Sequence, residues 1–256
     1  GYMDVRYRFY GIGNDQNRVG ISFDILQEAP MYFGSAEFRV WRKLFVGLGY
    51  LGGRVESRAR LQLDGPPPFF DPSLDLDIGA LTVPIKWDSR DHEQFPRDGW
   101  FVDGRAMLFR ESVGGDFDAE TFEVGINRFL PVRTEDVFAV RAYFRTTSGD
   151  APFFLLSTFG GSTDLRGYPS GRYRDRMMYA LQGEYRRHVS DRWIVTGFAG
   201  VGEVAEGVGG FGENFLPAAG AGLRFVLSPK HRIALSVDVA AGKDGTEFYF
   251  GVGEAF

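Results

Sequence analysis

The sequence contains no cysteine, which excludes a disulfide-stapled scaffold, a thiolate metal site and a cysteine nucleophile. It also has no run of about 18 apolar residues, so it predicts no transmembrane helix. The formal net charge of −5 argues against a general nucleic-acid binder, whose surface would be basic. No basic segment followed by an apolar one opens the chain, so we expect any signal peptide to be already removed or to lie outside this sequence.

Glycine and phenylalanine are abundant, with 35 and 25 residues, and the 44% of hydrophobic residues excludes a disordered protein. The apolar residues recur with a period of two. In 231–241, for example, Ile233, Leu235, Val237 and Val239 alternate with polar or small residues. A β-strand places such a set on one face, whereas a helix would scatter it.

Twelve segments show this alternation, and most are longer than the roughly five or six residues usual for a strand. The predicted strands cover 2–10, 29–42, 43–56, 74–88, 98–110, 116–129, 135–147, 174–188, 191–203, 214–228, 230–242 and 246–256. Short connections alternate with long ones, and 148–173 is the longest. This arrangement is typical of a membrane barrel with short periplasmic turns and long extracellular loops.

A soluble sandwich or a lipocalin-like barrel would also alternate, with its apolar face turned inward. Two features favour lipid contact instead. The polar faces carry long charged side chains, among them Arg141, Arg145 and Glu184, which suit a hydrated lumen. Aromatic residues lie near strand ends, as in an interfacial girdle: Tyr2, Tyr32, Trp87, Trp100, Trp193, Phe215 and Phe256. We therefore predict an all-β fold over 1–256, a transmembrane antiparallel up-and-down β-barrel of about 12 strands.

The 148–173 connection is unusually apolar for an external loop, since it holds Phe153, Phe154, Leu155 and Phe159. Exposed, these side chains would form a sticky patch. We therefore expect this long extracellular loop to fold back into the lumen, where the apolar surface can be buried.

Residues 161–168 read Gly-Ser-Thr-Asp-Leu-Arg-Gly-Tyr and 171–175 read Gly-Arg-Tyr-Arg-Asp, and Glu-Tyr-Arg follows at 184–186. Over about 148–256 the chain resembles the BamA/TamA-type superfamily of outer-membrane proteins, also called bacterial surface antigens. In that family a Val/Leu-Arg-Gly-Phe/Tyr tip folds into the barrel, and its arginine meets acidic groups on the inner wall. The resemblance implies that Leu165, Arg166, Gly167 and Tyr168 form this tip here.

An arginine in a narrow lumen needs a carboxylate partner, and Glu184 points inward by the parity of its strand. In the family the next strand carries Phe-x-Asp-x-Gly, but Gly200 stands at the acidic position here. Glu184 or Glu203 is therefore expected to receive Arg166. Arg141 and Arg145 are the other predicted inner-wall residues.

The chain ends in an alternating aromatic strand in which Phe248, Phe250 and the terminal Phe256 are expected to share one face. Such an ending looks like the sorting signal of bacterial outer-membrane proteins, which is read by strand pairing. The alternative is an ordinary edge strand that stops at phenylalanine.

Signals of catalysis or cofactor binding are weak, so we predict a non-enzyme without catalytic residues, cofactor or metal. His92 lies in a mixed acid/base cluster that is better interpreted as a solvated turn. Ser162 lacks the Gly-x-Ser-x-Gly context of a nucleophile elbow. Four aspartates lack the spacing of a calcium loop: Asp64, Asp71, Asp75 and Asp77. The segment 207–212 resembles a nucleotide-binding loop only in its glycines.

The resemblance implies a protein of the bacterial outer membrane that inserts or transports proteins, or lipids. The family's periplasmic transport-associated repeats are absent from this sequence, and twelve strands replace about sixteen. The alternative is a passive solute pore or a structural barrel whose lumen charges select solutes; a rim enzyme is a third reading. Expected partners are outer-membrane lipid and lipopolysaccharide, client barrel proteins and a second copy in a homodimer, but no nucleic acid.

Overall fold

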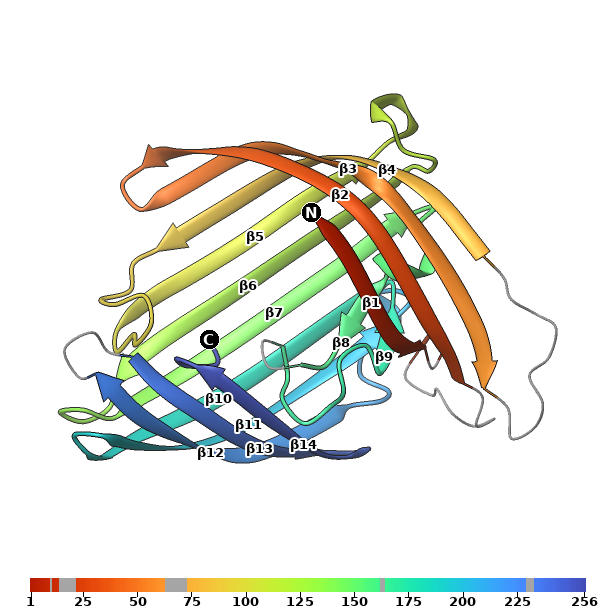
Figure 1. Ribbon diagram of the computed structural model, residues 1–256. Helices are drawn as coiled ribbons and strands as arrows, with labels where there is room; N and C mark the ends of the chain where they lie inside the picture. Colours follow the sequence, from red (N-terminus) through yellow and green to blue (C-terminus); the bar gives the residue numbers. More distant parts are fainter. Residues whose placement is uncertain (10, 14–21, 63–72, 162–163, 229–232) are drawn as a thin grey trace.

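The computed structural model describes residues 1–256 except 10, 14–21, 63–72, 162–163 and 229–232. Its main feature is one antiparallel sheet of twelve strands in the order β1-β2-β3-β4-β5-β6-β7-β10-β11-β12-β13-β14 (Figure 1). The sheet curls around an interior that also holds the short strands β8 and β9 (Figure 1). Each long strand pairs with the one before it, apart from the β8–β9 insertion, so the predicted up-and-down topology is confirmed.

Most strands are long. Those of the main sheet are β1 (Tyr2–Phe9), β2 (Ser22–Trp41), β3 (Leu44–Gln62), β4 (Ser73–Asp88), β5 (Gly99–Phe109), β6 (Ala119–Pro131), β7 (Val137–Gly149), β10 (Met177–Ser190), β11 (Trp193–Ala205), β12 (Leu216–Ser228), β13 (Ile233–Gly242) and β14 (Gly245–Val252). Inside lie β8 (Ser157–Phe159) and β9 (Tyr173–Asp175), and single 3-10 turns are η1 (Glu111–Val113), η2 (Phe153–Leu155) and η3 (Val208–Gly210). None of the helices in these described residues is long and apolar enough to cross a membrane.

The two faces of the sheet have the polarity of a membrane barrel. Val237 is 44% exposed and Phe250 is 77% exposed on the outer face, whereas Glu184 is fully buried and Arg141 is 9% exposed inside. A soluble barrel would show the opposite pattern. Charged side chains that turn inward while valine and phenylalanine turn outward are stable only when the outer surface meets hydrocarbon.

All four tryptophans lie at one end of the sheet, beside the short turns and the longer 89–98 connection. Trp41 ends β2, Trp87 precedes the last residue of β4, Trp100 follows the first residue of β5, and Trp193 begins β11. Each is at least 42% exposed. Indole rings prefer the membrane–water interface, so these residues mark one edge of the apolar band.

Two strands extend well beyond the sequence-based expectation. β2 begins at Ser22 rather than 29, and β3 continues to Gln62 rather than 56. These extensions lie at the long-loop end, where 24–28 reads Asp-Ile-Leu-Gln-Glu and shows no period-two alternation. The small β8–β9 ladder inside the long loop was not predicted either.

The last strand ends at Val252, because the chain turns inward at Gly253, whose φ is 90°. Phe248 and Phe250 remain on the outer face, but Phe256 packs inside against Phe129, Val137 and Ala139. The expectation that Phe256 shares a face with the other two, and that it belongs to the aromatic girdle, is therefore wrong. The segment 253–256, here called the tail, lies in the lumen.

The sheet has a seam between its first and last strands. β1 pairs with β2 and β14 pairs with β13, but no ladder joins β1 to β14 among the described residues. The outward side chains of β14 are very exposed, with Phe248 at 65% and Val252 at 71%. The seam is therefore the place where the sheet offers unpaired backbone groups.

Candidate functional site: the lumen loop and its seat

The 150–176 loop folds into the interior, as predicted. Leu156 is 6% exposed and Phe159 is fully buried, and Phe159 packs with Leu165, Tyr168 and Tyr173 of the same loop. This cluster rests on apolar wall residues of β10, β11 and β12. Phe154 and Leu155 contact a second apolar cluster on the opposite wall, so the loop bridges the lumen.

Arg166 is the centre of the seat and is completely buried. Its Nη1 donates to Asp238 Oδ2 at 2.7 Å, and its Nη2 pairs with Glu184. The guanidinium lies 3.4 Å above the ring centroid of Phe198. A buried guanidinium is stable only with such compensation, and here two carboxylates and an aromatic face provide it.

Arg166 belongs to a larger closed set of charges, here called the arginine–carboxylate ring. In order around the ring its members are Arg166, Glu184, Arg186, Glu254, Arg224 and Asp238, and each is paired with the next and the last with the first. Three positive and three negative groups balance in a site where every side chain is at most 6% exposed. The ring ties the loop to β10, β12 and β13 and, through Glu254, to the tail.

The residues beside Arg166 fit closely. Gly167 has a φ of 116°, and a Cβ there would lie 3.0 Å from Ala218 Cβ, so no other residue fits without strain. Gly200 stands where the resemblance predicted an acidic residue, and a Cβ on it would lie 2.5 Å from Leu165 Cδ1. The missing carboxylate thus makes room for the leucine of the tip, while Asp238 supplies a charge from another strand.

The tip is also bonded to the β13–β14 hairpin. The backbone N–H of Gly167 donates to Tyr249 Oη at 2.9 Å, and the N–H of Lys243 donates to Tyr168 Oη at 3.2 Å. Arg172 Nε donates to Asp244 Oδ2 at 3.2 Å. The loop therefore holds the inner side of β14, whose outer edge forms no ladder with any described strand.

The predicted inner-wall residues have different partners. Glu184 receives Arg166, but Glu203 does not: it accepts three backbone N–H groups of the β11–β12 loop, at 2.7–3.1 Å. Arg141 donates to Asn127 Oδ1 at 2.9 Å on the wall, and Arg145 Nη2 donates to the loop carbonyl of Leu155 at 3.2 Å. The carboxylate that the sequence reasoning missed is Asp238, although it lies on the polar face of the clearest alternating strand.

The weaker candidates of the sequence do not form a catalytic or metal site in the described residues. His92 Nδ1 accepts the N–H groups of Gln94 and Phe95, both at 3.2 Å, so it shapes the 89–98 connection. Asp77 is paired with Arg54 at 2.7 Å, whereas Asp64, Asp71 and Ser162 lie outside the described residues. Within that part of the chain no group of three or more His, Asp or Glu could hold a metal ion.

A comparison with family models identifies the fold. The model of the Omp85 superfamily domain matches residues 75–256, well over half of the chain. The chain belongs to the Omp85 superfamily. The predicted resemblance to BamA/TamA-type barrels is thereby confirmed, and the matched region contains the lumen loop and the whole arginine–carboxylate ring.

A solved structure shares the fold. It is the crystal structure of BamA from Haemophilus ducreyi lacking POTRA domains 1-3, which matches with a TM-score of 0.58 at 16% identity. The match covers 91% of this chain and 61% of that chain, so the present chain spans about three fifths of that structure's length. A search of curated proteins gave no match.

Proposed function

We propose that this Omp85-type barrel resides in the bacterial outer membrane and takes part in the insertion or transport of proteins, or of lipids. The observation that carries the proposal is the seam. Each neighbouring pair of strands in the sheet forms a ladder, except that none joins β1 and β14 in the described residues. In lipid, unpaired backbone N–H and C=O groups are costly, so such an edge attracts another strand.

A client strand is the partner that this chemistry suits. It would add to the edge of β14 or β1 by main-chain hydrogen bonds, as in β-augmentation. The side chains beside that edge are apolar and point outward, since Phe248 and Phe250 are 65% and 77% exposed. A strand added there would already have its own apolar face at the depth of the lipid.

The alternative, a passive pore, is less well supported. The loop crosses the lumen and is held by buried charges, which restricts the path that a solute would take. The two functions separate in a planar bilayer: a pore gives steady conductance that increases when residues 150–172 are deleted. An insertion protein gives little conductance in its resting form.

The proposal is tested by reconstituting the chain in liposomes and measuring how fast a urea-unfolded eight-stranded barrel protein folds into them. We expect acceleration over empty liposomes. Since the chain has no cysteine, bismaleimides of increasing length can be tested between Val5→Cys and Phe250→Cys, and a linker that bridges the seam should abolish the acceleration. The matched control joins Phe122→Cys to Thr146→Cys, which are paired across β6 and β7 away from the seam. Equal rates with and without the chain, or equal rates for both cross-linked forms, would contradict the proposal.

The outer face and the seam together determine the expected partners. Apart from clients, lipid and lipopolysaccharide should contact the outer face, and a second copy could pair β1 with β14 in a homodimer. Light scattering with detergent correction, together with cross-linking through Val5→Cys and Phe250→Cys, distinguishes the forms. Cross-links within one chain indicate a monomer that closes its own seam, and cross-links between chains indicate the homodimer.

A further inference from the structure

The connection between β4 and β5 is the exception among the short turns, because its residues 89–98 cross the end of the barrel. Phe95 packs against Ile194, Val226 and Ala234 of β11, β12 and β13, on the far side of the sheet order. Arg97 donates to the carbonyl of Thr134 in the β6–β7 turn. The connection therefore roofs the short-turn mouth of the lumen.

The shape of this roof is fixed by its own hydrogen bonds. Arg90 pairs with Asp88 through two N–H groups, at 2.7 and 3.0 Å, and stacks 4.0 Å above the ring of Phe101. Asp91 Oδ1 accepts the N–H groups of Arg97 and Asp98, at 2.8 and 3.2 Å. Because these hydrogen bonds fix the shape of the 89–98 connection, the space beneath it is preformed.

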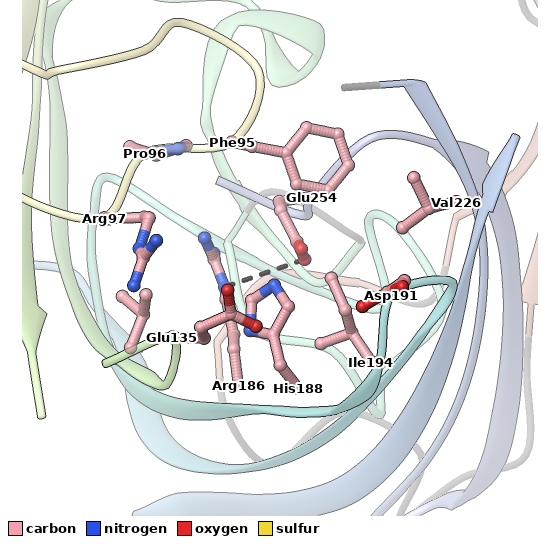
Figure 2. Close-up of a pocket in the computed structure, with 11 residues that line it drawn as sticks. Phe95, Pro96, Arg97, Glu135, Arg186, His188, Asp191, Ile194, Val226 and Glu254 are labelled. Carbon is pink, nitrogen blue, oxygen red and sulfur yellow. Dashed lines mark ion pairs between the residues drawn. The ribbon is translucent and has the colours of Figure 1, made fainter. Parts of the chain in front are cut away.

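That space is a cavity of about 300 Å³, at the small end of the range of pockets that hold ligands. Figure 2 shows Phe95 and Pro96 above it, with Arg186 and His188 below and Glu254 and Val226 to one side. The cavity lies at the short-turn mouth beside the tail, and none of its lining residues belongs to β1 or β14.

The floor of the cavity contains unused hydrogen-bonding capacity. Arg186 is 2% exposed; its Nε donates to Glu184 and its Nη2 donates to the carbonyl of Phe256, but its Nη1 has no acceptor among the described residues. His188 Nδ1 also has no partner there. A buried donor without an acceptor is costly, so this floor is suited to a ligand that brings one.

The walls and the rim determine what kind of ligand fits. Phe95, Ile194 and Val226 provide an apolar wall. Glu135 and Asp191 are exposed carboxylates at the rim, and in the described part of the chain neither forms an ion pair. Glu254 is already paired with Arg186 and Arg224, so the charges left at the rim are Glu135, Asp191 and the single cation Arg97. This net negative set disfavours an anion, so a neutral acceptor is expected to reach Arg186, and a positive charge is favoured at the rim.

We propose that this cavity binds an extended peptide segment in which an apolar side chain is followed by a lysine or arginine. The apolar side chain lies against Phe95 and Ile194. A backbone carbonyl accepts from Arg186 Nη1, and the basic group reaches Glu135 and Asp191. The site does not use the seam, so peptide binding and accelerated folding of a client can fail independently.

Calorimetric titration of the detergent-solubilised protein with acetyl-Gly-Leu-Lys-Gly-amide tests the proposal. We expect saturable binding of one peptide per barrel. The double variant Glu135→Gln and Asp191→Asn should weaken it about three- to tenfold, since exposed charge pairs contribute modestly. Phe95→Ala should weaken it through the lost apolar wall. The matched control, Asp150→Asn with Glu213→Gln, removes the same charge at the opposite end and should bind like the parent.

Peptides that lack one feature sharpen the test. Replacing the lysine by glutamine should weaken binding as much as the rim variant does, and replacing the leucine by serine should abolish it. No saturable binding at millimolar peptide, or unchanged affinity in the rim variant, overturns the proposal. So does displacement of the peptide by glycerophosphoethanolamine, which would assign the cavity to a lipid headgroup. Unchanged heat-modifiable migration of each variant in gels shows that the barrel remains folded.

Discussion

Replacement of Arg166 by alanine tests the seat of the loop most directly. The ring then holds two buried arginines, Arg186 and Arg224, against three carboxylates, so one negative charge is uncompensated. Removing one partner of a buried ion pair destabilises proteins by about 3–5 kcal/mol. The stacking on Phe198 at 3.4 Å is lost as well. Because the freed loop also lets water reach the carboxylates, we expect the free energy of unfolding to fall by up to about 3–5 kcal/mol.

Urea unfolding in detergent micelles, followed by the fluorescence of the four tryptophans, measures this loss. A spin label on Ser170→Cys, an exposed position in the loop, reports whether the loop moves, and no native cysteine interferes. The matched control is Arg105→Ala. Arg105 also faces the lumen but is more than half exposed and lies 3.8 Å from Glu123, so its loss should cost at most about 1 kcal/mol.

The charge balance also gives a prediction of sign. Asp238→Asn in the Arg166→Ala background restores two positive and two negative groups, so it should recover part of the lost stability, although each change alone is destabilising. Three results would refute the reasoning: equal stability of the Arg166 and Arg105 variants, unchanged label mobility, or additive destabilisation in the double variant.

Three further changes test the faces and the turns of the barrel. Val237→Arg on the outer face should cost about 2–4 kcal/mol in liposome unfolding, whereas Leu227→Arg beside the turn should cost about 0–1 kcal/mol, because the penalty falls with distance from the bilayer centre. Equal costs would contradict the outward placement. The hydroxyl of Tyr185 donates to Asp136 in the β6–β7 turn and lowers the pKa of that carboxyl. The stabilisation is present at pH values above the pKa of Asp136 in the unfolded chain, and it is lost as the pH falls through the lowered pKa of Asp136 in the folded protein. Tyr185→Phe should therefore lose less stability than the parent between about pH 5 and pH 2, the window of carboxyl titration. Glu203→Gln should cost about 1–3 kcal/mol, because one backbone N–H then faces an amide NH₂; amide exchange should rise in the β11–β12 loop while the Ser170 label stays immobile.

The sequence could predict which way each strand faces, because the period of two is a property of the strand alone. Val237 and Glu184 lie on the predicted sides for this reason. The inward turn of Phe256 could not be predicted in the same way. It depends on a backbone bend at Gly253 and on a pocket formed by Phe129 and Ala139, more than a hundred residues away.

Only one of the two carboxylate partners of Arg166 could be predicted, for a similar reason. Glu184 lies eighteen residues further along the chain, on the strand that directly follows the loop. Asp238 lies seventy-two residues away, and its approach depends on the register of β12 and β13 and on how far the loop enters the lumen. Parity places Asp238 on the inner face but does not give its height, so its pairing with Arg166 became visible only in three dimensions.

The ring and the seam are linked through β14. A terminal strand with one ladder is held weakly from the side, because its outer edge has no strand partner in the part of the chain that the structure describes. From within, Tyr249 receives the N–H of Gly167, and Glu254, two residues beyond the strand, joins Arg186 and Arg224. Tyr249 thus contacts the loop segment that carries Arg166, and Glu254 belongs to the same ring of charges as Arg166. The position of the strand at the seam is therefore set by the same buried charges that fix the loop, so a change that unseats Arg166 also loosens β14 where a client would pair.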